Sequence, residues 1–140
     1  METKFNFSSQ ICTTIEQSER LLALGLRKET ADCALLPLTD KVTSVLVKPS
    51  TNDIKNTIPA WSLHRLLCFL PNYIQVPDNV WEYKHDLYLS IDEELNVRYE
   101  ENVYEPCFDK TFWSGNIYQN CISCIKWLIK EGYFNKEYLV

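Results

Sequence analysis

The spacing of hydrophobic residues along the chain predicts three helices. Residues 15–24 carry apolar side chains on one helical face, and Thr14 and Gln17 are placed as the two partners of a capping box at its start. Residues 60–70 have leucines on one face and are bounded by a proline on either side. Residues 117–131 follow an asparagine that can cap a helix and precede a glycine that can end one. We therefore expect helices over these three ranges.

Two regions have residue patterns that are typical of strands. Residues 33–38 and 42–47 predict a short edge strand followed by a firmer strand rich in β-branched side chains. Residues 86–91 and 95–100 alternate on either side of an acidic turn and predict a β-hairpin with one face toward a core. The polar residues 49–59 predict a connecting loop, with an active-site lid as the alternative.

The predicted elements combine into one α+β domain. Its length, residues 1–140, suits a single core, and a hydrophobic content of 46% favours an ordered globular protein. We expect about three helices packed on a small antiparallel sheet that includes the hairpin. The first residues lack the features of a signal peptide, and no run approaches the roughly 20 apolar residues that span a membrane. These features predict a cytoplasmic protein without membrane contact.

The net charge of −5 is concentrated in one segment. Residues 92–109 hold seven acidic residues and a single base, Arg98, so this segment alone has a net charge of −6. A solvated hairpin is the simplest interpretation, and mimicry of DNA or binding of a hard cation are the alternatives. The chain has no basic stripe that could neutralise phosphates, which argues against nucleic-acid binding.

The six cysteines raise the question of metal binding or redox chemistry. Their spacing does not match a disulfide framework, and only Cys121 and Cys124 form a CxxC pair. A zinc site would need a second pair of ligands, and a redox motif would need a helix N-terminus, whereas this pair lies inside the predicted third helix. We expect reduced thiols and neither metal nor cofactor. Both cysteines should be buried on the face that they share with Ile117, Ile125 and Leu128.

The second face of the predicted helix 60–70 carries an unusual group of side chains. Trp61, His64, Arg65 and Cys68 follow helical spacing on this face. His64 and Cys68 lie one turn apart, which formally resembles a base beside a nucleophile, but no residue that would orient the histidine can be assigned. Tryptophan and arginine are frequent at interface hot spots, so Trp61, His64 and Arg65 are the candidate partner-binding residues. The alternative is that Trp61 packs inside the domain itself.

Three parts of the chain look familiar when they are taken together. They are QSERLLALGL at 17–26 leading to TAD at 30–32, then PAWSLHRLL at 59–67, and finally WLIKEGY at 127–133. In this order they resemble a family of small uncharacterised proteins found in prophages and mobile elements of Bacteroides-type gut bacteria. The resemblance spans most of the chain and implies a cytoplasmic bacterial or phage context. It assigns no catalytic residue, and it directs attention to the 30–32 and 59–65 stretches as a possible surface.

The sequence as a whole favours a non-enzymatic interaction or accessory protein of phage or mobile-element origin. Its partner would be another protein or a second copy of the chain. The alternative is a small hydrolase or transferase whose site has no recognisable motif. The two hypotheses require different structures: an enzyme needs a deep pocket with converging titratable groups, whereas an interaction protein needs an exposed apolar patch or a symmetric interface.

Overall fold

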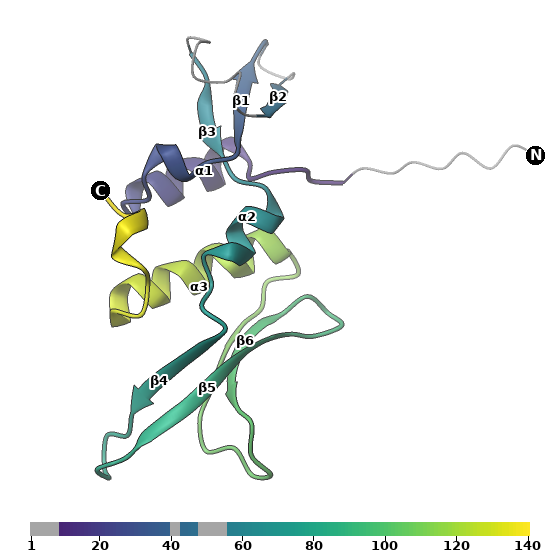
Figure 1. Cartoon of the computed structure of the whole chain (residues 1–140). Helices are drawn as coiled ribbons and strands as arrows, with labels where there is room; N and C mark the ends of the chain where they lie inside the picture. Colours follow the sequence, from purple (N-terminus) through teal and green to yellow (C-terminus); the bar gives the residue numbers. More distant parts are fainter. Residues whose placement is uncertain (1–8, 40–42, 48–55) are drawn as a thin grey trace, which may run out of the picture.

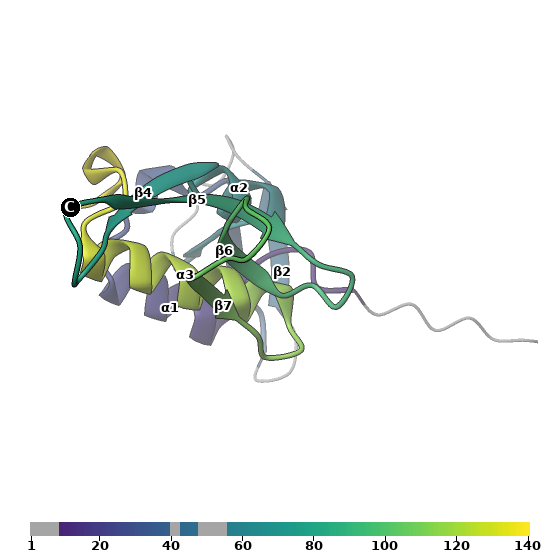
Figure 2. The same cartoon turned by 90° about the horizontal axis from the view of Figure 1, so that it is seen from below.

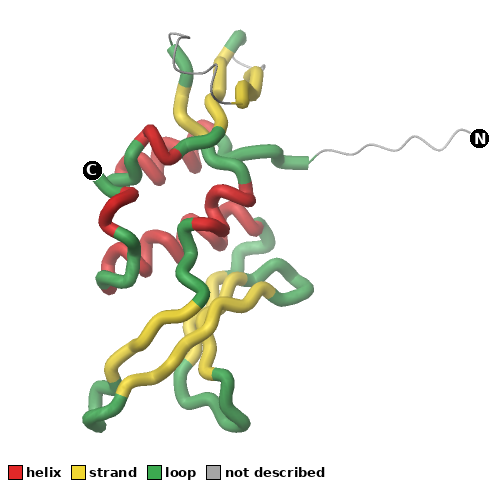
Figure 3. Tube along the Cα trace, in the orientation of Figure 1, coloured by secondary structure: helices red, strands yellow, loops and turns green. Residues whose placement is uncertain are grey.

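Three helices lie between two antiparallel sheets. The computed structural model describes residues 9–39, 43–47 and 56–140, and these residues form one body with a small sheet at one end and a larger sheet at the other (Figure 1). The small sheet has the strand order β2-β1-β3, and the larger sheet has the order β4-β5-β6-β7. Figure 3 shows the helices grouped between the two sets of strands. The predicted α+β class with about three helices is confirmed, but the sequence did not reveal two separate sheets.

The larger sheet is a meander in which each strand pairs with its neighbour in sequence. Its strands are β4 (Tyr73–Pro77), β5 (Lys84–Ile91), β6 (Val97–Glu101) and β7 (Asp109–Phe112). Leu87, Val97 and Tyr99 have no exposed surface, because alternate side chains point to the inner face of the sheet. Figure 2 looks onto this sheet from below and shows α3 running behind it. The outer face of the sheet is turned away from the helices.

Helix α3 (Ile117–Glu131) has the bounds that the sequence predicts. Asn116 caps its N-terminus, since its side-chain oxygen accepts a hydrogen bond from the backbone N–H of Gln119. Gly132 ends the helix in the left-handed region, with φ of 82°. Both ends are therefore set by local residues that the sequence makes recognisable.

Helix α3 is buried on two sides rather than along one stripe. Of the five side chains predicted to be buried, Cys121, Cys124, Ile125 and Leu128 have no exposed surface, and Ile117 is half-buried. Three further residues are buried as well: Tyr118, Asn120 and Ile122. The reason is that α3 packs against the larger sheet on one side and against α1 and α2 on the other. The prediction for the CxxC pair is confirmed, and the buried surface is wider than expected.

Helix α1 (Ile15–Ala23) begins with the predicted capping box. Thr14 Oγ1 accepts from the backbone N–H of Gln17, and Gln17 Oε1 accepts from the backbone N–H of Thr14, both at 3.1 Å. Gly25 follows the helix with φ of 101°, a conformation that glycine adopts without steric cost. The local prediction for this helix is confirmed to within one residue at its C-terminal end.

The segment after α1 pairs with the C-terminal end of the chain. Leu26 and Leu139 form an isolated antiparallel β-bridge, and Arg27 Nε donates to the carbonyl of Leu139 at 2.8 Å. Further along the same interface, Arg20 Nη1 donates to Gln119 Oε1 at 2.7 Å. The first helix is thus held by residues about a hundred positions later in the chain.

Helix α2 is shorter than predicted at both ends, and its expected first residue belongs to a strand. The helix spans Leu63–Cys68, whereas β3 (Ile58–Ala60) pairs with β1 (Cys33–Pro37), with Ala60 opposite Cys33. The prediction that Ala60 begins the helix is therefore wrong. Strand β2 (Thr43–Val47) pairs with the other side of β1. Strand β1 is therefore the central strand of the small sheet, and the prediction of an edge strand over 33–38 is wrong. Most of the predicted 49–59 loop lies outside the described residues.

Candidate partner-binding surface

Trp61 lies in the core rather than on a surface. Its side chain has no exposed area, and its indole Nε1–H donates to Thr30 Oγ1 at 3.0 Å. Its backbone N–H also donates to Thr13 Oγ1, at 3.1 Å. Because the ring is buried and its one polar atom is hydrogen-bonded, it leaves nothing for a partner to contact. Trp61, one of the three candidate partner-binding residues, therefore has a structural role.

The other two candidates, Arg65 and His64, differ in their surroundings. Arg65 is half-buried, its Nε donates to the carbonyl of Thr30 at 2.7 Å, and its guanidinium carbon lies 5.4 Å from the centre of the Phe69 ring. His64 is exposed, and its Nε2 lies 3.7 Å from Sγ of Cys68, so the expected contact across one helical turn is present. A partner-binding role for His64 and Arg65 stays a prediction.

Hydrogen bonds join the two stretches that the family resemblance singles out. The carboxylate of Asp32 accepts from the backbone N–H of Ser62 at 2.8 Å and from its hydroxyl at 2.5 Å. Ser62 Oγ in turn accepts from the backbone N–H of Arg65 at 3.1 Å and so caps α2. These bonds connect the residue before β1 to the N-terminal cap of α2. The stretches 30–32 and 59–65 therefore both have a structural role.

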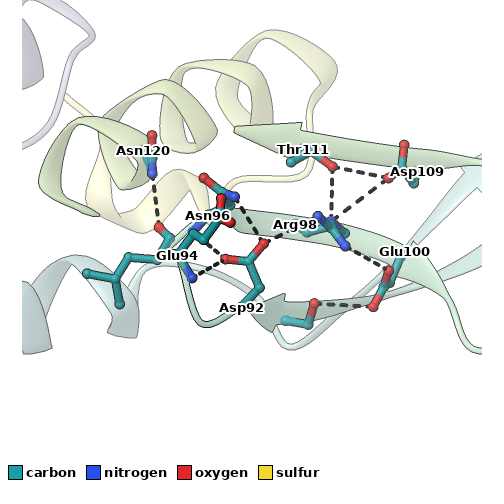
Figure 4. Close-up of polar contacts among 10 residues, drawn as sticks. Asp92, Glu94, Asn96, Arg98, Glu100, Asp109, Thr111 and Asn120 are labelled. Carbon is teal, nitrogen blue, oxygen red and sulfur yellow. Dashed lines mark hydrogen bonds and ion pairs between the residues drawn. The ribbon is translucent and has the colours of Figure 1, made fainter. Parts of the chain in front are cut away.

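Three carboxylates of the acidic segment 92–109 surround Arg98 on the outer face of the larger sheet. Arg98 forms ion pairs with Asp92, Glu100 and Asp109 at N–O distances of 3.4, 3.7 and 3.9 Å (Figure 4). All four side chains are partly exposed, so each pair contributes only about 0–1 kcal/mol. Asp92 also accepts backbone N–H bonds within the β5–β6 turn, chiefly from Asn96, and these bonds lower its pKa. The geometry fits the simplest interpretation, a solvated hairpin.

Several exposed hydrophobic side chains lie at the other end of the larger sheet. The β4–β5 loop (78–83) and the β6–β7 loop (102–108) leave the sheet at the same end, because neighbouring strands run antiparallel (Figure 1). Five large side chains on these loops are more than half exposed, and we call them the tip surface: Val80 (77%), Trp81 (67%), Tyr83 (51%), Val103 (57%) and Tyr104 (99%).

A buried histidine connects the bases of the two loops. His85, at the start of β5, is 7% exposed, and its Nε2 lies 2.8 Å from the carboxylate of Asp78. Its Nδ1 lies 2.8 Å from Glu101 at the end of β6, an ion-pair separation without the alignment of a hydrogen bond. The imidazole stacks on Phe108 at 5.8 Å and meets the edge of Tyr83 at 5.0 Å between ring centres. The imidazole ring of His85 therefore contacts residues at the base of both loops.

The electrostatics of this connection favour a protonated histidine between two carboxylates. Hydrogen bonding to Asp78 raises the pKa of His85 against the opposing effect of desolvation, and the charge of Glu101 raises it further. Asp78 accepts the backbone N–H groups of Val80 and Trp81 at 2.7 and 2.8 Å. These two bonds, followed by the bond to His85, lower the pKa of Asp78 to about 2. Asp78 thus shapes the loop that carries Trp81.

A pocket of about 490 Å³ opens beside the tip surface. It lies between the end of α3 and the loop end of the sheet, and Val80 belongs to both the pocket and the tip surface. Seven of its lining side chains are aromatic or titratable: Asp78, His85, Cys107, Phe108, Trp127, Glu131 and Tyr133. Trp127 and Tyr133 contact each other with ring centres 5.9 Å apart. The pocket thus combines aromatic faces with carboxylates.

The same pocket contains an exposed thiol, Cys107, but the arrangement does not suit nucleophilic catalysis. A catalytic base needs a free ring nitrogen directed at the thiol, and both nitrogens of His85 face carboxylates instead. The Sγ of Cys107 lies 3.9 Å from the carbonyl of Glu105. The pocket is therefore better suited to binding than to chemistry.

All six cysteines fall within the described ranges, and none forms a disulfide bond, so the prediction of unpaired cysteines is confirmed. Burial raises the pKa of Cys121 to about 12 and raises that of Cys124 further, which keeps both thiols protonated and unreactive. No group of three or more His, Cys, Asp or Glu side chains in the described part of the chain is placed to hold a metal ion. The CxxC pair packs as small hydrophobic residues.

The tip surface was not predicted from the sequence. Trp81 and Tyr83 lie between two strands, shortly after Pro77, Asp78 and Asn79, which are typical turn residues. Aromatic residues in a turn have no place in a core, so this combination could have indicated an exposed hydrophobic loop. The adjacent loop at 102–108 could not be paired with it from sequence, because β7 was not predicted.

Comparisons with protein-family models, with curated proteins and with solved structures found no match for this chain. Among the described residues, no helix has both the length and the apolar character needed to cross a membrane.

Proposed function

We propose that the chain is a non-enzymatic, cytoplasmic interaction or accessory protein of phage or mobile-element origin, which binds a protein partner through the tip surface. The supporting observation is the exposure of Trp81 and Tyr104 on two loops that share one end of the sheet. Tryptophan and tyrosine dominate the energetics of protein interfaces, because they bury a large area while losing little conformational entropy. Hydrophobic groups of this size on a folded surface are a usual mark of a contact site.

The base of the tip surface supports the same proposal. The ion pairs of His85 connect the two loops, and Asp78 fixes the turn before Trp81 through its backbone hydrogen bonds. Loops held in one conformation bind more tightly, because less conformational entropy is lost when a partner docks. The arrangement is that of a preorganised contact surface.

The alternative of a hydrolase or transferase has less support. His85 has no free ring nitrogen, and His64 and Cys68 contact each other on an exposed helix surface. Neither His85 with Cys107 nor His64 with Cys68 offers the converging, partly buried groups with which enzymes activate a nucleophile.

The proposal can be tested with variants whose effects differ by position. The double variant Trp81→Ser, Tyr104→Ser removes the two most exposed aromatic side chains of the tip surface, and Trp113→Ser removes a tryptophan of similar exposure (76%) that follows β7 at the other end of the sheet. His64→Ala tests the predicted surface on α2. Each variant and the wild type serve as bait at equal concentration in a lysate of a Bacteroides-type gut bacterium, and sedimentation measures self-association.

The expected result is that the tip variant loses a partner, or loses self-association, that the Trp113→Ser variant retains. Equal recovery by all baits together with unchanged sedimentation would reject the tip surface as the contact site. If the His64→Ala variant loses the partner and the tip variant retains it, the contact site lies on α2, as predicted from the sequence.

A further inference from the structure

The negative charge of the chain is concentrated in the larger sheet and its loops. Residues 73–112, which form the larger sheet and its loops, contain ten acidic and three basic residues, a net charge of −7. The remainder of the chain therefore has a net charge of +2, although the whole chain carries −5. A surface of one sign attracts partners of the opposite sign and speeds their association. The tip surface belongs to the acidic end, so its partner should present positive charge.

The pocket beside the tip surface has the chemistry of a cation site. Phe108, Trp127 and Tyr133 place three aromatic rings in its wall, and Glu131 places a carboxylate at the end of α3. Among the described residues, the Glu131 carboxylate forms no hydrogen bond or ion pair. Aromatic faces attract cations through their quadrupole, and the attraction strengthens when the cation is removed from water.

The positive charge of His85 does not cancel this preference. Two carboxylates, Asp78 and Glu101, flank the imidazole, so the three groups together have a net charge of −1 when His85 is protonated and −2 when it is neutral. Glu131 adds a further negative charge to the pocket wall. Asp78, His85 and Glu131 are its only carboxylate or imidazole side chains among the described residues. The pocket is therefore negative in either state of His85.

We infer that this pocket receives the side chain of a lysine or arginine from a basic segment of the protein partner, while the tip surface holds the hydrophobic residues of the same segment. The inference rests on the proposed function and adds the class of partner. A lysine or arginine side chain has the right form for the site, because its apolar stem can lie against the rings while its charged end reaches the carboxylates. Val80, shared by the pocket and the tip surface, makes the two regions continuous.

The test uses short peptides in place of the partner. Acetyl-Gly-Arg-Gly-amide and acetyl-Gly-Lys-Gly-amide carry the proposed group, acetyl-Gly-Gln-Gly-amide is the neutral control, and tetramethylammonium chloride represents a free organic cation. Binding is followed by NMR through the indole N–H signal of Trp127. It is also followed by the rate at which iodoacetamide alkylates Cys107 in the pocket, with the exposed Cys68 on α2 as an internal reference.

A matched pair of variants separates local from general electrostatics. Glu131→Gln removes the unpaired carboxylate of the pocket, and Glu19→Gln removes another exposed carboxylate, on α1. We expect the two cationic peptides to shift the Trp127 signal and to slow alkylation of Cys107 but not of Cys68. Glu131→Gln should weaken binding by roughly threefold, the size expected for one partly exposed ion pair, and Glu19→Gln should leave it unchanged.

Three outcomes would overturn the inference. The cationic peptides could bind no better than the glutamine peptide, Glu131→Gln and Glu19→Gln could have equal effects, or tetramethylammonium could bind as tightly as the peptides, which would assign the pocket to a small organic cation. The proposed function is tested separately by the tip variant. Loss of partner with that variant but no peptide binding would retain the function and reject only the pocket. Peptide binding without loss of partner would reject the tip surface as the contact site, and with it the assignment of the pocket to a basic segment of the partner.

Discussion

The replacement of Trp61 by phenylalanine tests the structural role of the residue most directly. The side chain has no exposed area, and its Nε1–H bond to Thr30 Oγ1 is 3.0 Å long. Phenylalanine keeps an aromatic ring but loses the N–H group and leaves a small cavity. The hydrogen bond contributes about 1 kcal/mol, and the lost volume costs about 1–2 kcal/mol. The donor of Thr30 stays satisfied by the carbonyl of Arg27 at 2.6 Å, so no buried donor becomes unpaired.

We therefore expect Trp61→Phe to lower the free energy of unfolding by about 2–3 kcal/mol, measured by urea denaturation with far-UV circular dichroism. A protein with a total stability of about 5–15 kcal/mol tolerates this loss and still folds. The matched control is Trp113→Phe, where the side chain is 76% exposed, and its effect should stay within about 0.5 kcal/mol. The double variant with Thr30→Val isolates the hydrogen bond through its coupling energy. Equal stability of the Trp61→Phe and Trp113→Phe variants would refute the reasoning, and loss of partner binding at unchanged stability would restore Trp61 as a contact residue.

Three further predictions follow from other parts of the structure. The double variant Cys121→Ala, Cys124→Ala should lower the free energy of unfolding by roughly 1–3 kcal/mol through lost buried volume, and elemental analysis of the native protein should find no stoichiometric zinc; metal that is retained in gel filtration and lost in this variant would contradict the packing role. Leu95→Gly should raise stability by up to about 1 kcal/mol, because Leu95 adopts a positive φ of 64° in the β5–β6 turn, and a lower melting temperature would show that its side-chain contacts outweigh the backbone strain. For pH, the lowered pKa of Asp78 gives a stabilisation that is complete above its ordinary value of 3.8 and lost as the pH falls through about 2, whereas the raised pKa of His85 gives one that is complete below 6.5 and lost as the pH rises through the raised value. Melting temperatures against pH should then lose part of their acid dependence in Asp78→Asn and part of their alkaline dependence in His85→Gln, and wild-type profiles in both variants would disprove the linkage.

The helices that the sequence predicts well are those whose ends are set by nearby residues. The capping box at Thr14, the cap at Asn116 and the left-handed Gly132 all act within one turn of the helix that they bound. Their signals are therefore fully contained in a short stretch of sequence. The start of α2 is different, because Ala60 pairs with Cys33 and Ser62 bonds to Asp32. These contacts join residues roughly thirty positions apart, and no local pattern reveals them.

The missed strands and the revised surface have a common cause. Strands β4 and β7 are short edge strands of five and four residues, and their alternation is too brief to separate from a loop. Without them, nothing in the sequence shows that the loops at 78–83 and 102–108 meet. On the second face of α2, the local pattern was clear but did not show which residues are exposed. A periodic group of unusual residues suggested a surface, but the strand at β3 turns Trp61 inward.

The pairing of Leu26 with Leu139 has a consequence for the order in which the chain folds during synthesis. The larger sheet consists of consecutive hairpins, so β4 to β7 can assemble as soon as they are made. Helix α1 is synthesised much earlier and contacts β3, but part of its surface is covered by α3, and the segment after it pairs with the C-terminal residues. Synthesis proceeds from the N-terminus, so the first helix to be made is among the last to be completely buried. Until then its leucines are the part of the nascent chain that a chaperone would recognise.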